Sequence, residues 1–248
     1  MASLKRSKDR KVTSLVRVGT KLDKKTGERV TDYQPAIANS IGLPSGKGFS
    51  CPEATSFCSQ ICYAGRLEKV YKGVSAVLLH NWNLLADASL EDTVSMLTEM
   101  VAEFVKESDK RKAPKIFRIH WDGDFFSATY VAAWARVIKD FDNVQFWAYT
   151  RVQSAAMFLH AQKLSNLALY FSGDRDNLEV AKYLESRGIN IAYVDTTFDA
   201  GKAEFPKATR CPENNGGIAL ISEKGSACAA CGLCVNGRKS VLFSSTKK

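Results

Sequence analysis

The chain has 248 residues, of which 45% are hydrophobic and 25% charged, a balance typical of a soluble globular protein with one sizeable α/β domain. No run approaches the roughly 20 apolar residues that a membrane span needs. The basic N-terminal segment also lacks the apolar core of a secretory signal, so we expect a cytoplasmic protein.

The formal net charge of +9 is concentrated near the two ends of the chain. Residues 1–30 carry ten basic and three acidic side chains, and residues 201–248 carry eight and three. Such basic ends either attract nucleic acid by neutralising phosphates or simply face water. We expect residues 1–50 to form a basic, irregular N-terminal arm and loop, and residues 51–248 to form a single α/β domain.

Two helices are predicted first, over residues 66–87 and from the N-cap Ser89 to about Glu107. Short apolar strands then alternate with helical segments. The predicted strands are 115–120, 144–149, 167–171, 189–194 and 218–221, and the helices between them are 127–140, 152–163 and 176–187. This alternation predicts a parallel sheet, curled into a full or partial TIM-like barrel of βα units. A flat, doubly wound sheet is the alternative.

Seven cysteines fall into two groups, and their odd number argues against a disulfide framework. The first group, Cys51, Cys58 and Cys62, lies in a loop just before a predicted helix, whose N-terminus favours the thiolate form. Three protein ligands on a four-iron cluster leave one iron open to a small molecule. We therefore expect this group to bind metal.

The second group occupies the cysteine-rich segment 211–234, where Cys211-Pro212 is followed by Cys228, Cys231 and Cys234. A tight C-x2-C-x2-C run with a distant Cys-Pro is the ligand pattern of ferredoxin-type four-iron clusters. Zinc is the competing metal, because four thiolates also suit a tetrahedral structural site. The sequence predicts one or two 4Fe-4S clusters. Which thiols share a cluster is left open.

Polar side chains follow the predicted strands, where βα barrels carry their active-site groups. Asp122, Gly123 and Asp124 come directly after the first strand of the sheet, and Ser172 follows the third. We expect these four residues to bind a cofactor close to the cysteine loop. The simpler reading is that the aspartates cap the helices that follow them.

The motif Leu43-Pro44, Cys51-Pro52, Cys58 and Cys62-Tyr63-Ala64 resembles the phage "gene product 88" family, over most of the chain. That resemblance implies a viral origin and a place in the cytoplasm of the infected host cell.

A three-cysteine loop ahead of βα units is also similar to the radical S-adenosylmethionine superfamily. That resemblance implies a partial barrel, a first cluster on Cys51, Cys58 and Cys62, and an S-adenosylmethionine site at Asp122–Phe125. The cysteine spacing here is six and three residues, whereas the superfamily usually has three and two.

Three hypotheses follow. The first is an iron–sulfur protein with a radical-S-adenosylmethionine-like barrel, in which S-adenosylmethionine is a cofactor. The second is a non-enzymatic iron–sulfur protein that binds nucleic acid through its basic termini, or a host protein. The third is a zinc-stabilised interaction protein.

Overall fold

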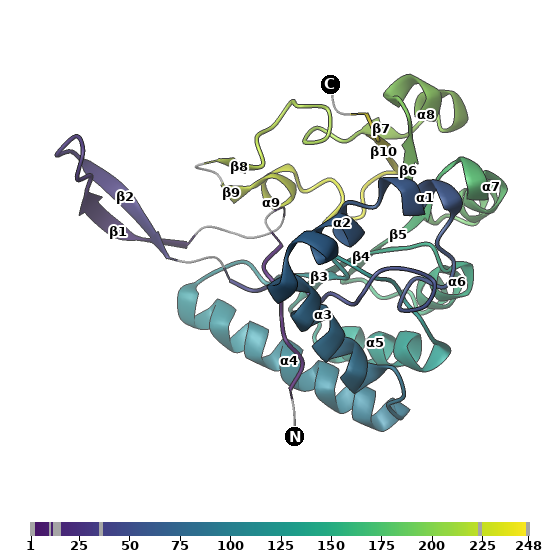
Figure 1. Ribbon diagram of the computed structural model, residues 1–248, viewed down its shortest axis with the longest axis horizontal. Coiled ribbons are helices and arrows are strands. Elements are labelled where there is room, and N and C mark those ends of the chain that lie inside the picture. Colours follow the sequence, from purple (N-terminus) through teal and green to yellow (C-terminus); the bar gives the residue numbers. More distant parts are fainter. Residues whose placement is uncertain (1–2, 10, 12–15, 35–36, 223–224, 247–248) are drawn as a thin grey trace.

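A six-stranded, all-parallel sheet forms the centre of the protein (Figure 1). The structure is a computed structural model that describes residues 3–9, 11, 16–34, 37–222 and 225–246. The strand order is β3-β4-β5-β6-β10-β7. The strands are β3 (Ile116–Ile119), β4 (Gln145–Thr150), β5 (Leu167–Gly173), β6 (Asn190–Asp195), β7 (Thr209–Arg210) and β10 (Val241–Ser244).

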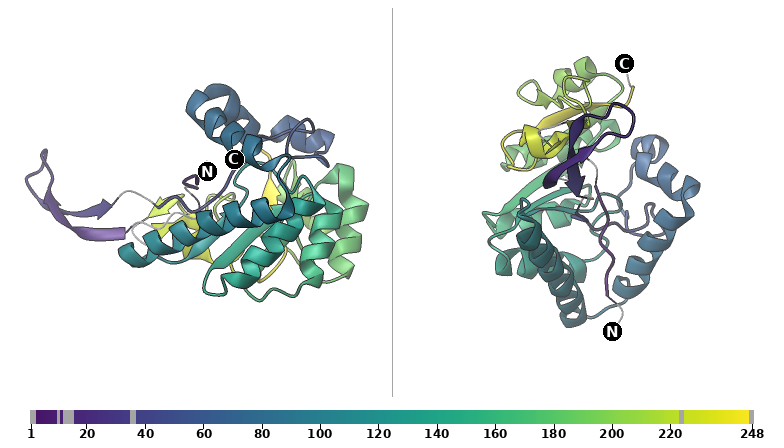
Figure 2. Two further views of the ribbon diagram at one scale, coloured as in Figure 1. Left: turned by 90° about the horizontal axis from the view of Figure 1, so that it is seen from below. Right: turned by 90° about the vertical axis from the view of Figure 1, so that its left-hand side faces the viewer.

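One layer of helices covers one face of this sheet, with α5 to α8 following the strands in turn (Figures 1 and 2). Because β3 to β6 are adjacent in chain order, right-handed crossovers place their helices on the same face. A doubly wound sheet would carry helices on both faces. The helices are α4 (Leu90–Arg111), α5 (Ala128–Asp140), α6 (Gln153–Ala161), α7 (Leu178–Ser186) and α8 (Phe198–Glu204).

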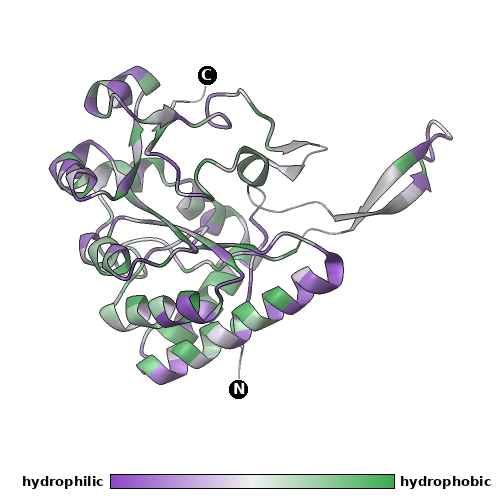
Figure 3. Ribbon diagram, turned by 180° about the vertical axis from the view of Figure 1, so that it is seen from behind, coloured by the Kyte–Doolittle hydropathy of each residue, from purple (hydrophilic) through white to green (hydrophobic). Residues whose placement is uncertain are grey.

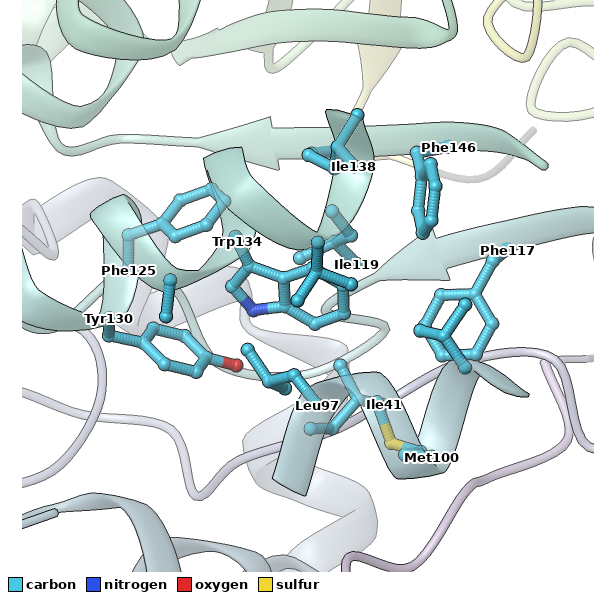
Figure 4. Packing of buried hydrophobic residues seen from close by; sticks show 14 of the residues in the cluster. Ile41, Leu97, Met100, Phe117, Ile119, Phe125, Tyr130, Trp134, Ile138 and Phe146 are labelled. Carbon is cyan, nitrogen blue, oxygen red and sulfur yellow. The ribbon is translucent and has the colours of Figure 1, made fainter. Parts of the chain in front are cut away.

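The main core lies between the sheet and this helix layer. Trp134 of α5 is fully buried among Phe117, Tyr130 and Phe146, as Figure 4 shows. The long helix α4 turns an apolar stripe to this core and a polar face outward (Figure 3). Ser89 and Ser127 cap α4 and α5 as predicted, each accepting a backbone N–H at the first turn.

The opposite face of the sheet is covered mainly by irregular chain, together with one short helix, α9 (Ala227–Cys231). Strand residues that alternate with the core positions point to it, including Trp147, Tyr170 and Ala192. They pack against Cys211, Cys234 and their neighbours from the C-terminal segment. We call this surface the open face of the sheet.

Two further helices, α2 (Tyr63–Val70) and α3 (Lys72–Leu85), pack on each other beside the sheet (Figures 1 and 2). They follow the short helix α1 (Ser56–Ile61). No helix in the described part of the chain is both long and apolar enough to cross a membrane.

The N-terminal residues are more ordered than the sequence indicated. Leu4 is buried, Ser7 bridges to Ser40, and Arg6 pairs with Glu107 of α4. An antiparallel hairpin follows, formed by β1 (Val16–Leu22) and β2 (Arg29–Gln34), which projects from the body (Figure 1). The expectation of irregular structure over residues 1–50 was therefore wrong at the hairpin. Arg10, Lys224, Lys247 and Lys248, which add to the predicted basic ends, lie outside the described residues.

Two other predicted elements need correction. The helix predicted over 66–87 is divided at Tyr71, whose extended backbone separates α2 from α3. The strand predicted over 218–221 does not join the central sheet. Its last residue begins β8 (Ile221–Ser222), which pairs with β9 (Gly225–Ser226), while β10 and β7 complete the sheet.

Candidate metal centre

The first cysteine group lies at the carboxyl ends of the strands. Thr55 caps α1 by accepting the N–H of Cys58, and the Cys62 thiol caps α2 by accepting the N–H of Gly65 at 3.3 Å. Cys51 lies in the preceding loop, 3.9 Å from the hydroxyl of Ser50. All three thiols are partly exposed.

An ion pair at the strand ends holds this loop in place. Asp174, which is fully buried, accepts hydrogen bonds from Arg151 at 2.5 Å and from the Thr55 hydroxyl at 2.6 Å. Its other carboxylate oxygen accepts the N–H of Asp176, and Asp176 in turn accepts the N–H of Phe57. The two aspartates therefore attach the cysteine loop to the end of β5.

Asp124 has a comparable structural role at the ends of β3 and β4. Its carboxylate accepts the Thr150 hydroxyl at 2.6 Å and the backbone N–H groups of Arg151 and Phe125, each at 2.7 Å. Burial raises the pKa of Asp124 to about 6. Protein donors thus occupy both oxygens of a residue that was predicted to bind a cofactor.

Gly123 makes close packing of the cysteine loop possible. Its φ is +86°, and a Cβ here would lie 2.5 Å from the Ser50 hydroxyl and 2.8 Å from the Cβ of Leu43. The groups that approach Gly123 closely therefore belong to the protein's own chain and not to a bound ligand. Ser172, the fourth predicted cofactor residue, is half-buried, and its carbonyl accepts an N–H from Asn177.

Substituting Gly123 with alanine is expected to lower the free energy of unfolding by about 3 kcal/mol. The backbone strain of a positive φ adds to the steric overlap of the new Cβ with Ser50 and Leu43. The matched control is Gly27→Ala in the hairpin turn, where φ is +71° and nothing lies within 4 Å of the new Cβ. Only the conformational cost, about 1 kcal/mol, applies there. Urea unfolding of both variants measures the difference, and equal losses would contradict the packing argument.

Asp122 differs from the other strand-end acids because one of its oxygens, Oδ2, is buried without a donor. The other oxygen accepts the N–H of Gly123 at 2.9 Å. Burial raises the pKa of Asp122 to about 8, and the adjacent carboxylate of Glu68 adds to the shift. Asp122 therefore carries a proton at neutral pH, and its protonated carboxyl can donate a hydrogen bond to the carboxylate of Glu68.

This raised pKa predicts a pH dependence of stability. Below about pH 4 the Asp122 carboxyl is protonated in both the folded and the unfolded state. Between about pH 4 and 8 it ionises only in the unfolded state, so the free energy of unfolding falls as the pH rises. Asp122→Asn removes the penalty. The variant is expected to be more stable than the parent by about 2 kcal/mol at roughly pH 7 and equally stable near pH 4. Urea unfolding at both pH values checks this, and a less stable variant at neutral pH would sink the explanation.

The second cysteine group surrounds a single cavity of about 10 Å³, room for about one water molecule. Cys211 directly follows β7, and the other three cysteines lie in the crossover to β10, where α9 (Ala227–Cys231) carries two of them. The cavity is lined by Cys211, Pro212, Glu213, Ile218, Ala227, Cys228, Cys231, Leu233 and Cys234. The structure thus brings together four thiols that are separated by up to 23 positions in the sequence.

Polar contacts attach this segment to the open face of the sheet. Gln145 donates to the carbonyl of Val235 at 2.9 Å, and the Tyr170 hydroxyl donates to that of Leu233 at 3.3 Å. Burial raises the pKa of Tyr149, so its phenol stays protonated beside Cys234.

Arg118 lies on the open face at the edge strand β3, and no sequence motif singled it out. Its guanidinium is paired with Asp9 and stacks over Trp147, 4.9 Å from the ring centroid. Its positive charge favours the thiolates of Cys228 and Cys234. The sequence feature that could have identified Arg118 is its charge within an otherwise apolar strand.

The N-terminal segment supplies a second cation. Lys11 pairs with Glu213 at 2.9 Å, and its carbonyl accepts the N–H of Cys228. Its ammonium group also favours the thiolate forms of Cys211 and Cys228. The two ends of the chain therefore meet at the second cysteine group, and part of the basic charge is used inside the fold.

Burial keeps most of these thiols protonated in the absence of metal. It raises the pKa of Cys51 and Cys228 to about 12, raises that of Cys234 to about 11, and raises those of Cys58 and Cys211. Metal binding must therefore release protons. Within the described residues, no three side chains of His, Cys, Asp or Glu are close enough to bind one metal ion in common.

Comparison with known proteins identifies the family. The profile of the "Gene product 88" family matches residues 3–237. The chain belongs to the gene product 88 family. It is 70% identical, over the full length of both chains, to the "Gene 88 protein" of Mycobacterium phage L5 and to that of Mycobacterium phage D29. No solved structure matches, and none of these matches names the radical S-adenosylmethionine superfamily.

Proposed function

We propose that this gene product 88 protein is a bacteriophage iron–sulfur protein in which Cys211, Cys228, Cys231 and Cys234 bind one 4Fe-4S cluster. The observation that carries the proposal is the convergence of these four thiols around one cavity on the open face of the sheet. The chemistry of the donors fits, because four thiolates are the usual ligand set of such a cluster.

The surroundings also fit an anionic metal–thiolate group. Arg118 and Lys11 lower the cost of thiolate charge, and the Tyr149 phenol is positioned to donate to Cys234. A four-iron cluster is held through four separate iron atoms, so its thiolates do not need to meet at one point. The cavity is small, so the segments that carry Cys211 and Cys228 must separate to admit a cluster.

We further propose that Cys51, Cys58 and Cys62 bind a second, incompletely ligated cluster at the strand ends. Cys58 lies close enough to Cys62 for a charge there to raise the pKa of the Cys58 thiol, whereas Cys51 lies against Asp124. Here the sheet would form part of a barrel, with the first group at the carboxyl ends of its strands and the second group on its open face.

S-adenosylmethionine chemistry is the catalytic form of this proposal. A cluster with an open iron would supply an electron to that ligand, and the protein's part is to orient it. Asp122 has an oxygen without a donor, whereas Asp124 and Gly123 are occupied by contacts within the chain. Of these three residues Asp122 alone keeps an unused oxygen, but that oxygen is buried and the carboxyl is protonated at neutral pH, so binding the ligand's amine would require it to lose its proton and become exposed.

The test of the catalytic form is electron paramagnetic resonance of the reduced, anaerobically purified protein, with and without S-adenosylmethionine. A shifted spectrum and release of 5′-deoxyadenosine are expected. An unchanged spectrum without cleavage leaves a non-catalytic cluster that serves as a scaffold for nucleic acid or a host protein in the host cytoplasm. A zinc-stabilised protein would lack the visible absorbance of a cluster.

A further inference from the structure

A basic, aromatic surface on α2 and the start of α3 is not used by the cysteine groups. Successive exposed positions of α2 fall on one side of the helix, because residues three or four apart share a face. The exposed residues of α2 are Tyr63, Arg66, Lys69 and Val70, and the exposed Tyr71 and Lys72 follow directly at the break before α3. We call these six residues the α2 surface.

The apolar members of this surface are unusually exposed for their size. Tyr63 is 53% exposed, Tyr71 is 56% exposed and Val70 is 68% exposed. The hydroxyl of Tyr63 donates to the carbonyl of Trp121 at 3.0 Å, which holds the ring in one position while about half of the residue meets solvent. A ring fixed in this way loses little conformational entropy when a ligand stacks on it.

The charge of this surface is positive and unopposed. Glu68 is the only acidic residue between Glu53 and Asp87 in the sequence. Its carboxylate accepts the backbone N–H of Ser45 at 2.9 Å and the Ser45 hydroxyl at 2.5 Å, so it faces the protein. Among the described residues, no ion pair involves Lys69 or Lys72.

We propose that the α2 surface binds single-stranded nucleic acid. Arg66, Lys69 and Lys72 match the phosphates, and Tyr63 and Tyr71 match the faces of unpaired bases, the combination that sequence-tolerant single-strand binding uses. In a duplex the base faces are stacked inside, so a duplex can pair its phosphates with the cations but cannot stack its bases on the tyrosines. The proposal needs no bound cluster, although Tyr63 directly follows the proposed ligand Cys62 and lies near Lys11 of the N-terminal segment.

The experiment measures fluorescence anisotropy of a labelled oligothymidylate of about 16 nucleotides, the upper end of single-strand site sizes, with the full-length protein. Lys69→Glu/Lys72→Glu is expected to weaken binding about tenfold or more and to reduce the slope of log affinity against log salt by about 1.4. Tyr71→Ala is expected to weaken binding about tenfold without changing that slope.

The matched control is Lys106→Glu/Lys110→Glu on the exposed side of α4, which makes the same change in net charge. It is expected to bind nearly as tightly as the unsubstituted protein. Equal losses in the two double variants overturn the proposal, and so does the absence of binding at low ionic strength. Binding to a duplex of the same length as tightly, or to phosphatidylserine vesicles in place of the oligonucleotide, also overturns it.

Discussion

Replacing Cys228, Cys231 or Cys234 with alanine is expected to remove most of the bound iron and to lower the melting temperature by about 10 °C or more. These thiols lie around one cavity in the crossover that leads to β10, which fits between β6 and β7 in the sheet. Structural metal sites contribute their binding free energy to folding, so a missing ligand weakens both binding and stability. Iron content and thermal unfolding measured on the same anaerobic preparation check the prediction.

The matched control for these variants is Ala230→Ser. Ala230 is exposed in the same short helix, α9, but it does not line the cavity. It should keep its iron and its melting temperature. If all three cysteine variants behave like this control, the four cysteines are ordinary buried thiols and the cluster assignment is wrong.

The second large effect is expected at Asp174. Asp174→Asn leaves the Arg151 guanidinium buried without its charge partner and weakens the bond to Thr55. Breaking a buried ion pair from one side typically costs about 3–5 kcal/mol. We therefore expect a loss of this size in the free energy of unfolding, together with greater protease sensitivity of the loop that carries Cys58.

Asp142→Asn is the control for this change, because Asp142 is exposed at the end of α5. It should change stability by less than about 0.5 kcal/mol. Urea unfolding compares the two variants. A loss at Asp174 no larger than the control's would mean that the ion pair does not secure the cysteine loop.

The central strands and helices could be predicted because their physical signals are local. β3 to β6 are apolar runs separated by helices with clear caps such as Ser127, and the predicted bounds differ by only a few residues. β7 has only two residues, and β10, although as long as β3, follows the cysteine-rich segment without a βα pattern to mark it. They form strands because the sheet offers them backbone partners. The only local signal for the break at Tyr71 is Gly73, two residues further on, which a helix also tolerates.

The residue types of the candidate site could be predicted from the sequence, whereas the side chains that hold the cysteines in place could not. Cysteine spacing alone indicated two groups, and the ends of the strands were expected to lie near the first of them. The pairing of Arg118 with Asp9 joins residues 109 positions apart, and no local pattern encodes such a contact. The aspartates illustrate the limit of motif reasoning, because a carboxylate at a strand end can serve the fold, as Asp124 and Asp174 do.

The most direct test of the account is quantitation of iron, acid-labile sulfide and zinc in the full-length protein purified without oxygen. Binding by the second cysteine group predicts about four iron and four sulfide per chain, and about eight of each when the first group also binds, with little zinc. One zinc per chain without sulfide would contradict the iron–sulfur proposal. Protein free of both metals and still fully folded would contradict any structural metal at these cysteines.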